Sequence, residues 1–226
     1  MNYKTELHCH SASVSACADI SPADIVAQYL ENGYSSIVLT EHLSPATFAE
    51  GNYSGGDSWN QKVDFFLSGY RALRDAAGDR LHVLLGAEIR VDSHSGTDFL
   101  VYGLTEEILY SLTDLLNDKP RVLSERLRAA GCLFCQAHPF RNNMKIVNPA
   151  LLDGIEVFNG NPSHDSRNAF AAMWAEQHSL IPLSGSDLHH PDYPINGGIL
   201  TDRPIETNEQ LLAILRSGSY TLIDRA

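Results

Sequence analysis

The sequence predicts an α/β protein that folds as a barrel, with one domain over residues 1–226. Short apolar segments rich in β-branched residues alternate with helical segments, as in parallel sheets that helices cover on both faces. Polar clusters follow these segments at the strand ends where βα loops form active sites. The alternative is an open, doubly wound sheet, but the chain has neither a Gly-x-Gly-x-x-Gly nor a Gly-x-x-x-x-Gly-Lys loop.

About seven strands carry the predicted barrel, and each element has its own signal. The first helix begins at Ser21-Pro22, an N-cap followed by proline, and ends at Gly33. The expected strands are the N-terminal segment up to His8, then 36–40, 81–85, 99–102, 132–136, 155–158 and 180–183, with short apolar segments at 199–201 and 220–223. The expected helices lie at about 22–33, 59–77, 106–117, 120–130, 165–178 and 208–216. Segment 43–58 is rich in Gly, Ser, Pro and Asn and is expected to be a lid or binding loop.

Composition narrows the range of partners and locations. Hydrophobic residues make up 43% and charged residues 19% of the chain, which is typical of a globular protein. The net charge of −12 would repel a phosphate backbone, so we expect no long nucleic acid as partner. The sequence has no apolar run long enough to cross a membrane and no signal-peptide pattern, and a cytoplasmic location is therefore expected. The oligomeric state is not indicated.

The chain is organised around Glu6-Leu7-His8-Cys9-His10, where an apolar segment ends. Residues i and i+2 of a strand point to the same side, so His8 and His10 can face one point. A His-x-His pair is also common on surfaces, and its meaning depends on partner ligands at later strand ends. Those partners are present: His42, Glu88, His138, Asp187 and His189 each follow a predicted strand. Imidazoles and carboxylates that converge in this way suit two or three divalent ions, and Glu88 could bridge two of them.

Together these motifs resemble the PHP family, the polymerase and histidinol phosphatase domain, over nearly the whole chain. The motifs are Glu6-Leu-His-Cys-His10, Thr40-Glu-His42, Gly86-Ala-Glu88, Ala137-His-Pro139 and Gly185-Ser-Asp-Leu-His189, in the family's order. The resemblance implies a distorted (β/α)7 barrel, similar to a TIM barrel, whose mouth holds two or three Zn, Mn or Fe ions. It also implies a hydrolase of phosphate esters.

The resemblance also implies a division of the ligands. One metal would take His8, His10, Glu88 and Asp187; a second would share Glu88 and take His138; a third would take His42 and His189. The chain departs from the family at two positions. Asp98 stands where a histidine is usual, with His94 as a nearby replacement, and Cys17 or Asp19 stands near the place of a further ligand after the His-x-His pair.

Other polar residues are candidates for supporting roles. Arg141 is a candidate phosphate clamp because its forked donors match phosphate oxygens, and a surface arginine is the alternative. Arg90 could face inward for the same purpose or form a structural ion pair. His164 lies in a predicted mouth loop and could touch substrate. Glu6 and Glu41 are expected to orient the ligating histidines.

The leading hypothesis is phosphomonoester hydrolysis through a metal-bound hydroxide, acting on a small phosphorylated metabolite or nucleotide. The candidate catalytic residues are Asp187, His189 and Glu88, and a proton for the leaving group could come from Asp187, His189 or a bound water. Two alternatives stay open. One is an amidohydrolase-type metal hydrolase, and the other is a PHP module that binds metal without catalysis.

Overall fold

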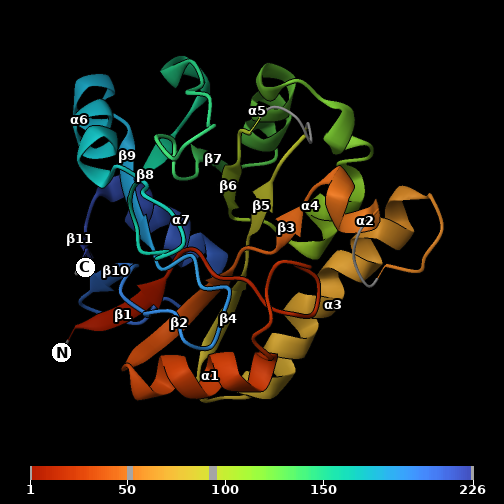
Figure 1. Cartoon of the computed structure of the whole chain (residues 1–226), viewed down its shortest axis with the longest axis horizontal. Helices are drawn as coiled ribbons and strands as arrows, with labels where there is room; N and C mark the ends of the chain where they lie inside the picture. Colours follow the sequence, from red (N-terminus) through yellow and green to blue (C-terminus); the bar gives the residue numbers. More distant parts are fainter. Residues whose placement is uncertain (1, 50–52, 92–95, 225–226) are drawn as a thin grey trace.

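The computed structural model describes residues 2–49, 53–91 and 96–224, which form a single-domain mixed α/β fold (Figure 1). The strands are β1 Tyr3–Glu6, β2 Tyr34–Leu39, β3 His42–Leu43, β4 His82–Leu85, β5 Ala87–Ile89, β6 Phe99–Tyr102, β7 Leu133–Gln136, β8 Gly154–Asn159, β9 Ile181–Gly185, β10 Ile199–Thr201 and β11 Thr221–Leu222. The helices are α1 Pro22–Glu31, α2 Pro45–Ala49, α3 Trp59–Ala77, α4 Glu106–Ser111, α5 Pro120–Ala129, α6 Asn168–His178 and α7 Asn208–Ser217, with short 3-10 turns η1 Leu115–Asn117 and η2 Pro149–Leu151.

The strands pair in two sheets. One sheet has the order β11-β10-β1-β2-β4 and the other has the order β3-β5-β6-β7-β8-β9. The predicted closed barrel of seven parallel strands is therefore not confirmed. Main-chain hydrogen bonds do join the extensions of the two sheets beyond β1 and β9, because Asp187 N donates to His8 O over 2.9 Å and His10 N donates to Leu188 O over 3.0 Å.

Strand direction is the second difference from the prediction. β6 runs antiparallel to both β5 and β7, and β10 runs antiparallel to β1. A parallel connection needs a crossover of a dozen or more residues, usually a helix. Only nine residues separate Ile89 from Phe99, so β6 returns along the sheet and begins at the edge where β5 ends. Asp98, directly before β6, consequently lies at the same edge as Glu88.

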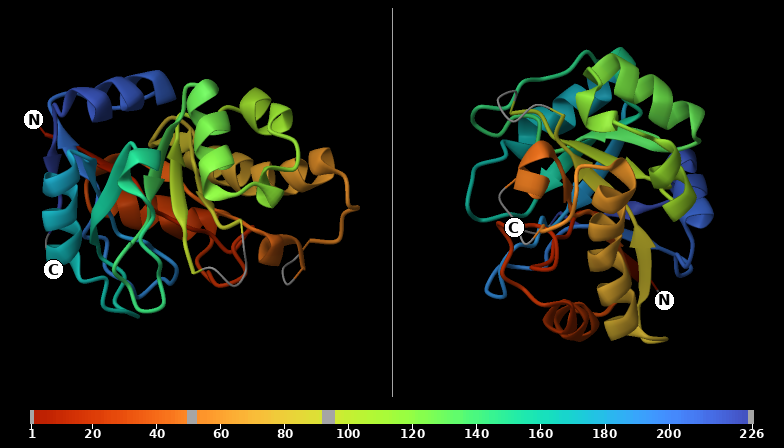
Figure 2. Two further views of the ribbon diagram at one scale, coloured as in Figure 1. Left: turned by 90° about the horizontal axis from the view of Figure 1, so that it is seen from above. Right: turned by 90° about the vertical axis from the view of Figure 1, so that its right-hand side faces the viewer.

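Helices cover the sheets on their outer side, and the views in Figure 2 show the strands between helices, with the long connecting loops gathered on the side opposite α7. α1 and α7 pack through different core clusters. Tyr29 of α1 is buried with Ile37 of β2, and Leu211 of α7 is buried with Leu100 of β6. In the described part of the chain, no helix combines the length and apolar character that a bilayer crossing requires.

Local signals in the sequence explain where the helices begin. Ser21, Ser58, Thr105 and Thr207 each accept a hydrogen bond from the backbone of the first turn of the helix that follows. These caps satisfy amide groups that have no partner within the helix. The predicted helix 106–117 is divided, because α4 ends at Ser111 and only the turn η1 continues it. The expected loop 43–58 contains the short helix α2.

Candidate metal centre

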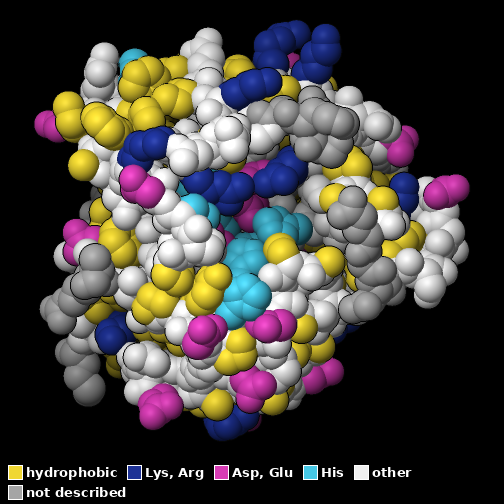
Figure 3. Space-filling view, viewed as in Figure 1, with side chains coloured by type: hydrophobic (Ala, Val, Ile, Leu, Met, Phe, Trp, Pro, Cys, Tyr) yellow, Lys and Arg dark blue, Asp and Glu magenta, His cyan; other side chains and the backbone are white. Residues whose placement is uncertain are grey.

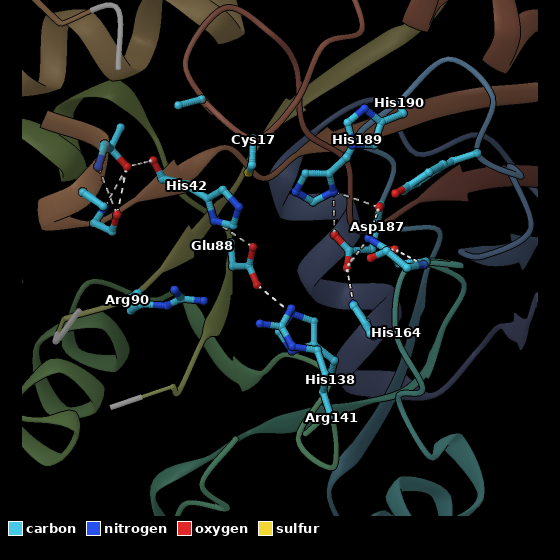
Figure 4. Close-up of a pocket in the computed structure, with 17 residues that line it drawn as sticks. Cys17, His42, Glu88, Arg90, His138, Arg141, His164, Asp187, His189 and His190 are labelled. Carbon is cyan, nitrogen blue, oxygen red and sulfur yellow. Dashed lines mark hydrogen bonds and ion pairs between the residues drawn. The ribbon is translucent and has the colours of Figure 1, made fainter. Parts of the chain in front are cut away.

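The seven predicted ligands at the strand ends lie together in one cluster, and Figure 4 shows five of them: His42, Glu88, His138, Asp187 and His189. They come from the segment after β1, from β3, from β5, from the turn after β7 and from the segment after β9. Four overlapping groups place their ligand atoms within 4.8 Å of one another: His10, His42 and His189; His8, His10 and Glu88; His8, His138 and Asp187; Glu88, Asp98 and His138. The position of these residues at the ends of predicted strands had indicated this convergence.

The deepest part of the cluster has the spacing of a metal site. His8 Nε2 lies 3.4 Å from Glu88 Oε2 and 3.3 Å from Asp187 Oδ1. His10 Nε2 lies 3.3 Å from Glu88 Oε2 and 3.4 Å from Asp187 Oδ1. Ligand bonds of ~2.0–2.1 Å arranged as a tetrahedron place neighbouring ligand atoms roughly 3.3–3.4 Å apart. These four residues are called the inner set below.

Burial supports the same conclusion. The four ligand atoms of the inner set are buried and have no hydrogen-bond partner among the described residues. Buried polar atoms nearly always have a hydrogen-bond partner, so four such atoms without one need an explanation. A divalent ion would satisfy all four atoms at once. The residues present therefore fit the metal that the sequence predicted.

Electrostatics point the same way. Burial raises the pKa of Glu88 and of Asp187, but the surrounding histidines outweigh it and hold both pKa values well below the usual range. Burial lowers the pKa of His42, but Glu88 and Cys17 outweigh this and raise it to about 10. The carboxylates raise the pKa of His8 and His138 in the same way, against the effect of burial. The buried carboxylates of Glu88 and Asp187 thus need positive charge beside them, from protonated histidines or from metal ions.

Glu156, in the middle of β8, was not among the predicted site residues. Its buried Oε1 lies 2.8 Å from His8 Nδ1, and its Oε2 accepts a hydrogen bond of 2.9 Å from His138 N. With the carboxylate ionised, His8 carries its proton on Nδ1 and leaves Nε2 free for a metal. Gly185 makes this approach possible, because a Cβ there would lie 2.3 Å from His8 Cβ and 2.8 Å from Glu156 Oε1.

Glu6 and Glu41 support the histidines indirectly. Glu6 Oε1 accepts hydrogen bonds of 2.9 Å from the backbone of Leu7, His8 and Ser186, so it fixes the chain on both sides of the site rather than an imidazole ring. Glu41 accepts from Ser15 Oγ, which lies 3.3 Å from His10 Nδ1. The expected orienting role therefore holds through a serine for Glu41 and through the backbone for Glu6.

Two of the predicted ligand residues have unusual backbone conformations. His138 has a φ of 22° and Asp187 a φ of 51°, both on the left-handed side that non-glycine residues rarely adopt. Asp187 is held there by its main-chain bond to His8, and His138 by its bond to Glu156. Strain of this kind persists where the surroundings fix the backbone, and it gathers at functional sites.

The two positions where the chain departs from the family pattern differ in their contacts. Both oxygens of Asp98 bind the guanidinium of Arg90, with Nε–Oδ1 at 2.5 Å and Nη2–Oδ2 at 2.6 Å. Asp98 Oδ2 lies 3.9 Å from His138 Nε2. His94, the alternative at this position, lies outside the described residues. At the other position, the carboxylate of Asp19 pairs with His190 over 2.7 Å.

Cys17 lies on the exposed side of the cluster and points toward His42 and His189 (Figure 4). Partial burial raises the pKa of its thiol, but hydrogen bonds to His189 and His42 outweigh this and lower the pKa to about 5. The thiolate is the form that binds metal. The three residues His42, His189 and Cys17 are called the mouth set below.

An open cavity of about 630 Å³ lies over the cluster. Its wall includes the three predicted substrate-binding residues Arg90, Arg141 and His164. His164 Nε2 lies 3.6 Å from Asp187 Oδ2, and the Arg141 guanidinium forms no ion pair or hydrogen bond with the described residues. In the space-filling view the histidines fill a hollow, with Lys and Arg side chains above it and Asp and Glu side chains below (Figure 3).

Comparison with known proteins gives the family. A model described as the PHP domain matches residues 6–222. The chain belongs to the PHP family. No curated protein matches it. Among solved structures, a two-domain protein from Bacteroides vulgatus that contains a predicted PHP-like metal-dependent phosphoesterase has a TM-score of 0.72 and 16% sequence identity, and the match covers 100% of this chain and 65% of that one.

Two further solved structures with similar folds carry different activity names. A lesion-specific endonuclease from Pyrococcus furiosus has a TM-score of 0.63 at 16% identity, over 98% of this chain and 58% of that one. An amidohydrolase from Chromobacterium violaceum, solved with bound sulfate and no metal, has a TM-score of 0.58 at 14% identity, over 94% of this chain and 96% of that one. At these identities the likeness shows the fold, and the substrate needs a separate argument.

Proposed function

We propose that this protein is a metal-dependent phosphomonoesterase that acts on a small phosphorylated metabolite or nucleotide. The observation that carries the proposal is the inner set, whose four ligand atoms have no hydrogen-bond partner among the described residues. Its two carboxylate residues, Glu88 and Asp187, line the same open cavity as Arg90 and Arg141. Metal ions held by the inner set and the guanidinium groups of Arg90 and Arg141 would together suit a substrate group with several anionic oxygens. Phosphate is the common group of that kind.

The inner set would hold one ion, and His42 and His189 would hold another at the mouth. Zn, Mn and Fe are the expected metals, since imidazole and carboxylate ligands suit them. When bound, such ions supply a water that is ionised near neutral pH and offset the negative charge of the phosphoryl oxygens.

The protein's own groups then have separable tasks. Asn159 and Asn161 donate to Asp187 Oδ2 over 3.1 and 3.3 Å, which leaves Oδ1 for an ion. His189 Nδ1 lies 3.0 Å from Asp187 O, a group that can only accept, so the basic nitrogen of a neutral His189 is Nε2. The Arg141 guanidinium, which has no ion pair or hydrogen bond with the described residues, would bind a phosphoryl oxygen. Glu88 and Asp187 would be the catalytic carboxylates.

Size and charge favour a small substrate. The cavity of about 630 Å³ lies within the range of roughly 300–1,000 Å³ that is usual for small-molecule sites. The net charge of −12 opposes binding of a long phosphate backbone. The endonuclease and amidohydrolase among the similar folds make a phosphodiester and an amide the necessary comparisons in a test.

The test is phosphate release from a panel of phosphomonoesters, nucleotides and histidinol phosphate by protein loaded with Mn²⁺ or Zn²⁺, beside Asp187→Asn. Bis(p-nitrophenyl) phosphate, a phosphodiester, and a panel of amides are measured in parallel. We expect phosphate release from monoesters, with a rate that falls more than about 100-fold in Asp187→Asn. Loss of a residue that only supports a ligand lowers metal affinity or activity by ~10–100-fold, and Asp187→Asn removes a predicted ligand itself. Cleavage of the diester or amide alone would contradict the proposal, and no turnover by metal-loaded protein would leave a non-catalytic module as the better description.

A further inference from the structure

Arg90 and Asp98 form an ion pair on the side of the cluster where Glu88 and His138 lie. Arg90 follows the end of β5 and Asp98 precedes the start of β6, so the antiparallel turn of the sheet brings them together. Asp98 is 1% exposed and Arg90 is 31% exposed. The guanidinium therefore lies between a buried carboxylate and the cavity, and Figure 4 shows it extending toward the middle of the cavity.

Glu88, Asp98 and His138 form one of the possible metal-binding groups. Its acidic oxygens, Glu88 Oε1 and both oxygens of Asp98, already have hydrogen-bond partners among the described residues. His138 Nε2 lies 3.0 Å from Glu88 Oε1, and the two oxygens of Asp98 both accept from Arg90. The inner set is the opposite case, since its four ligand atoms have no hydrogen-bond partner among the residues that the structure describes. The two buried acidic oxygens that lack a hydrogen-bond partner in the described part of the chain, Glu88 Oε2 and Asp187 Oδ1, thus both belong to the inner set.

Arginine is well suited to act as a permanent cation at such a place. Its guanidinium stays charged at any working pH and presents five donors in a planar fork. Asp98 uses Nε and Nη2, and Nη1 forms no hydrogen bond with the described residues. The buried carboxylate of Asp98 is neutralised without a metal, while part of the guanidinium remains at the cavity wall.

We propose that Arg90 takes the place of a metal ion beside Glu88, Asp98 and His138. The chain then binds ions at the inner set and at the mouth set, but none at Asp98, and the Arg90 guanidinium supplies the third positive charge. Contact between this guanidinium and a phosphoryl oxygen rests on the proposed function. The number of bound ions does not, because it can be measured without any substrate.

The experiment counts metal ions in four proteins. Wild type, Arg90→Met, the double variant Arg90→Met/Asp98→Asn and the control Arg126→Met are equilibrated with Zn²⁺, passed through a desalting column and analysed for zinc per chain. Arg126 is a matched control because it is 30% exposed and pairs with Asp118 over 2.5 Å, outside the cavity lining. Circular dichroism establishes that each variant is folded.

Arg90→Met is expected to gain one zinc per chain over wild type, because its loss leaves a buried carboxylate next to Glu88 and His138. The double variant loses that gain, and Arg126→Met matches wild type. An unchanged zinc content in folded Arg90→Met would overturn the proposal. Should Arg90→Met not fold, anomalous diffraction at the zinc edge from wild-type crystals decides: a peak within bonding distance of Asp98 overturns the proposal, and peaks only at the inner and mouth sets support it.

Phosphate release takes no part in this readout. A protein that hydrolyses phosphate esters and holds an ion at Asp98 would refute the role of Arg90 alone. A protein that gains an ion in Arg90→Met but cleaves no phosphate ester would refute the proposed function alone.

Discussion

The inner and mouth sets use the same kinds of side chain but are held differently. His8 and His10 are fully buried, and Glu156 and Ser15 fix their rings from behind. At the mouth, His42 is 23% exposed, His189 is 12% exposed and Cys17 is exposed. The inner side chains are thus held in place from behind, whereas those of the mouth set are more open to solvent.

Glu156→Gln is expected to have the largest effect on this comparison, because it weakens the support of the inner set. The amide cannot accept in the same way at both His8 Nδ1 and His138 N. Loss of such support costs roughly 10–100-fold in metal affinity. The measurement is competition for Zn²⁺ against a chelator of known affinity.

The control for this change is Glu31→Gln, an exposed position on α1. Glu156→Asp is expected to recover part of the affinity, since a carboxylate is restored. A variant that loses thermal stability but keeps its zinc affinity would show that Glu156 supports the fold and not the ligands.

Arg141→Ala tests the mouth from the side of the substrate. A charge-assisted hydrogen bond to phosphate contributes about 1.5–3 kcal/mol, so a rise of roughly tenfold or more in KM is expected. Metal content should not change, because Arg141 does not contact the inner set. Steady-state kinetics on the best monoester of the panel measure the effect, with the exposed Arg121→Ala as control; equal KM values in the two variants would remove Arg141 from the phosphate site.

Cys17→Ser should have the smallest effect, on metal preference at the mouth. A soft thiolate favours Zn²⁺ over Mn²⁺, and a hydroxyl does not. We expect the ratio of zinc to manganese affinity to fall about threefold, with inner-set binding unchanged. Binding of Co²⁺ gives a direct readout, since a sulfur-to-cobalt absorption band in the near ultraviolet should be present in wild type and absent in Cys17→Ser. A band that persists would exclude Cys17 as a ligand.

The convergence of the side chains could be predicted because His8, His42, Glu88, His138 and Asp187 each follow a predicted strand. The two sheets meet where these strands end, since the backbone of Asp187 bonds to that of His8. The helices were also accessible to prediction, since caps such as Ser58 and Thr207 are local signals.

The antiparallel strand was missed because strand direction depends on what connects the strands. No helix was predicted between 81–85 and 99–102, which was a usable signal against a parallel crossover. Under a parallel arrangement Asp98 would lie at the wrong edge of the sheet. Its partnership with Arg90 follows only from the observed direction of β6.

Glu156 was missed for a different reason. In Ile155-Glu156-Val157-Phe158 it occupies a strand interior, and the search for ligands considered strand ends. A single carboxylate inside a strand that is otherwise apolar is itself a signal, because a buried charge needs partners. Which partners those are depends on packing between β8 and the segment after β1, which residue order alone does not give.

The left-handed backbone at Asp187 has a consequence for how this position can vary. Asparagine and glycine adopt that conformation readily, whereas valine or isoleucine would strain the chain beside His8. In a library of all substitutions at position 187, two separate selections therefore act. The cellular abundance of the variants would follow the backbone preference, with asparagine above the β-branched residues. Catalytic activity would be lost with asparagine and with β-branched residues alike. Abundance and activity would therefore rank the substitutions at position 187 differently.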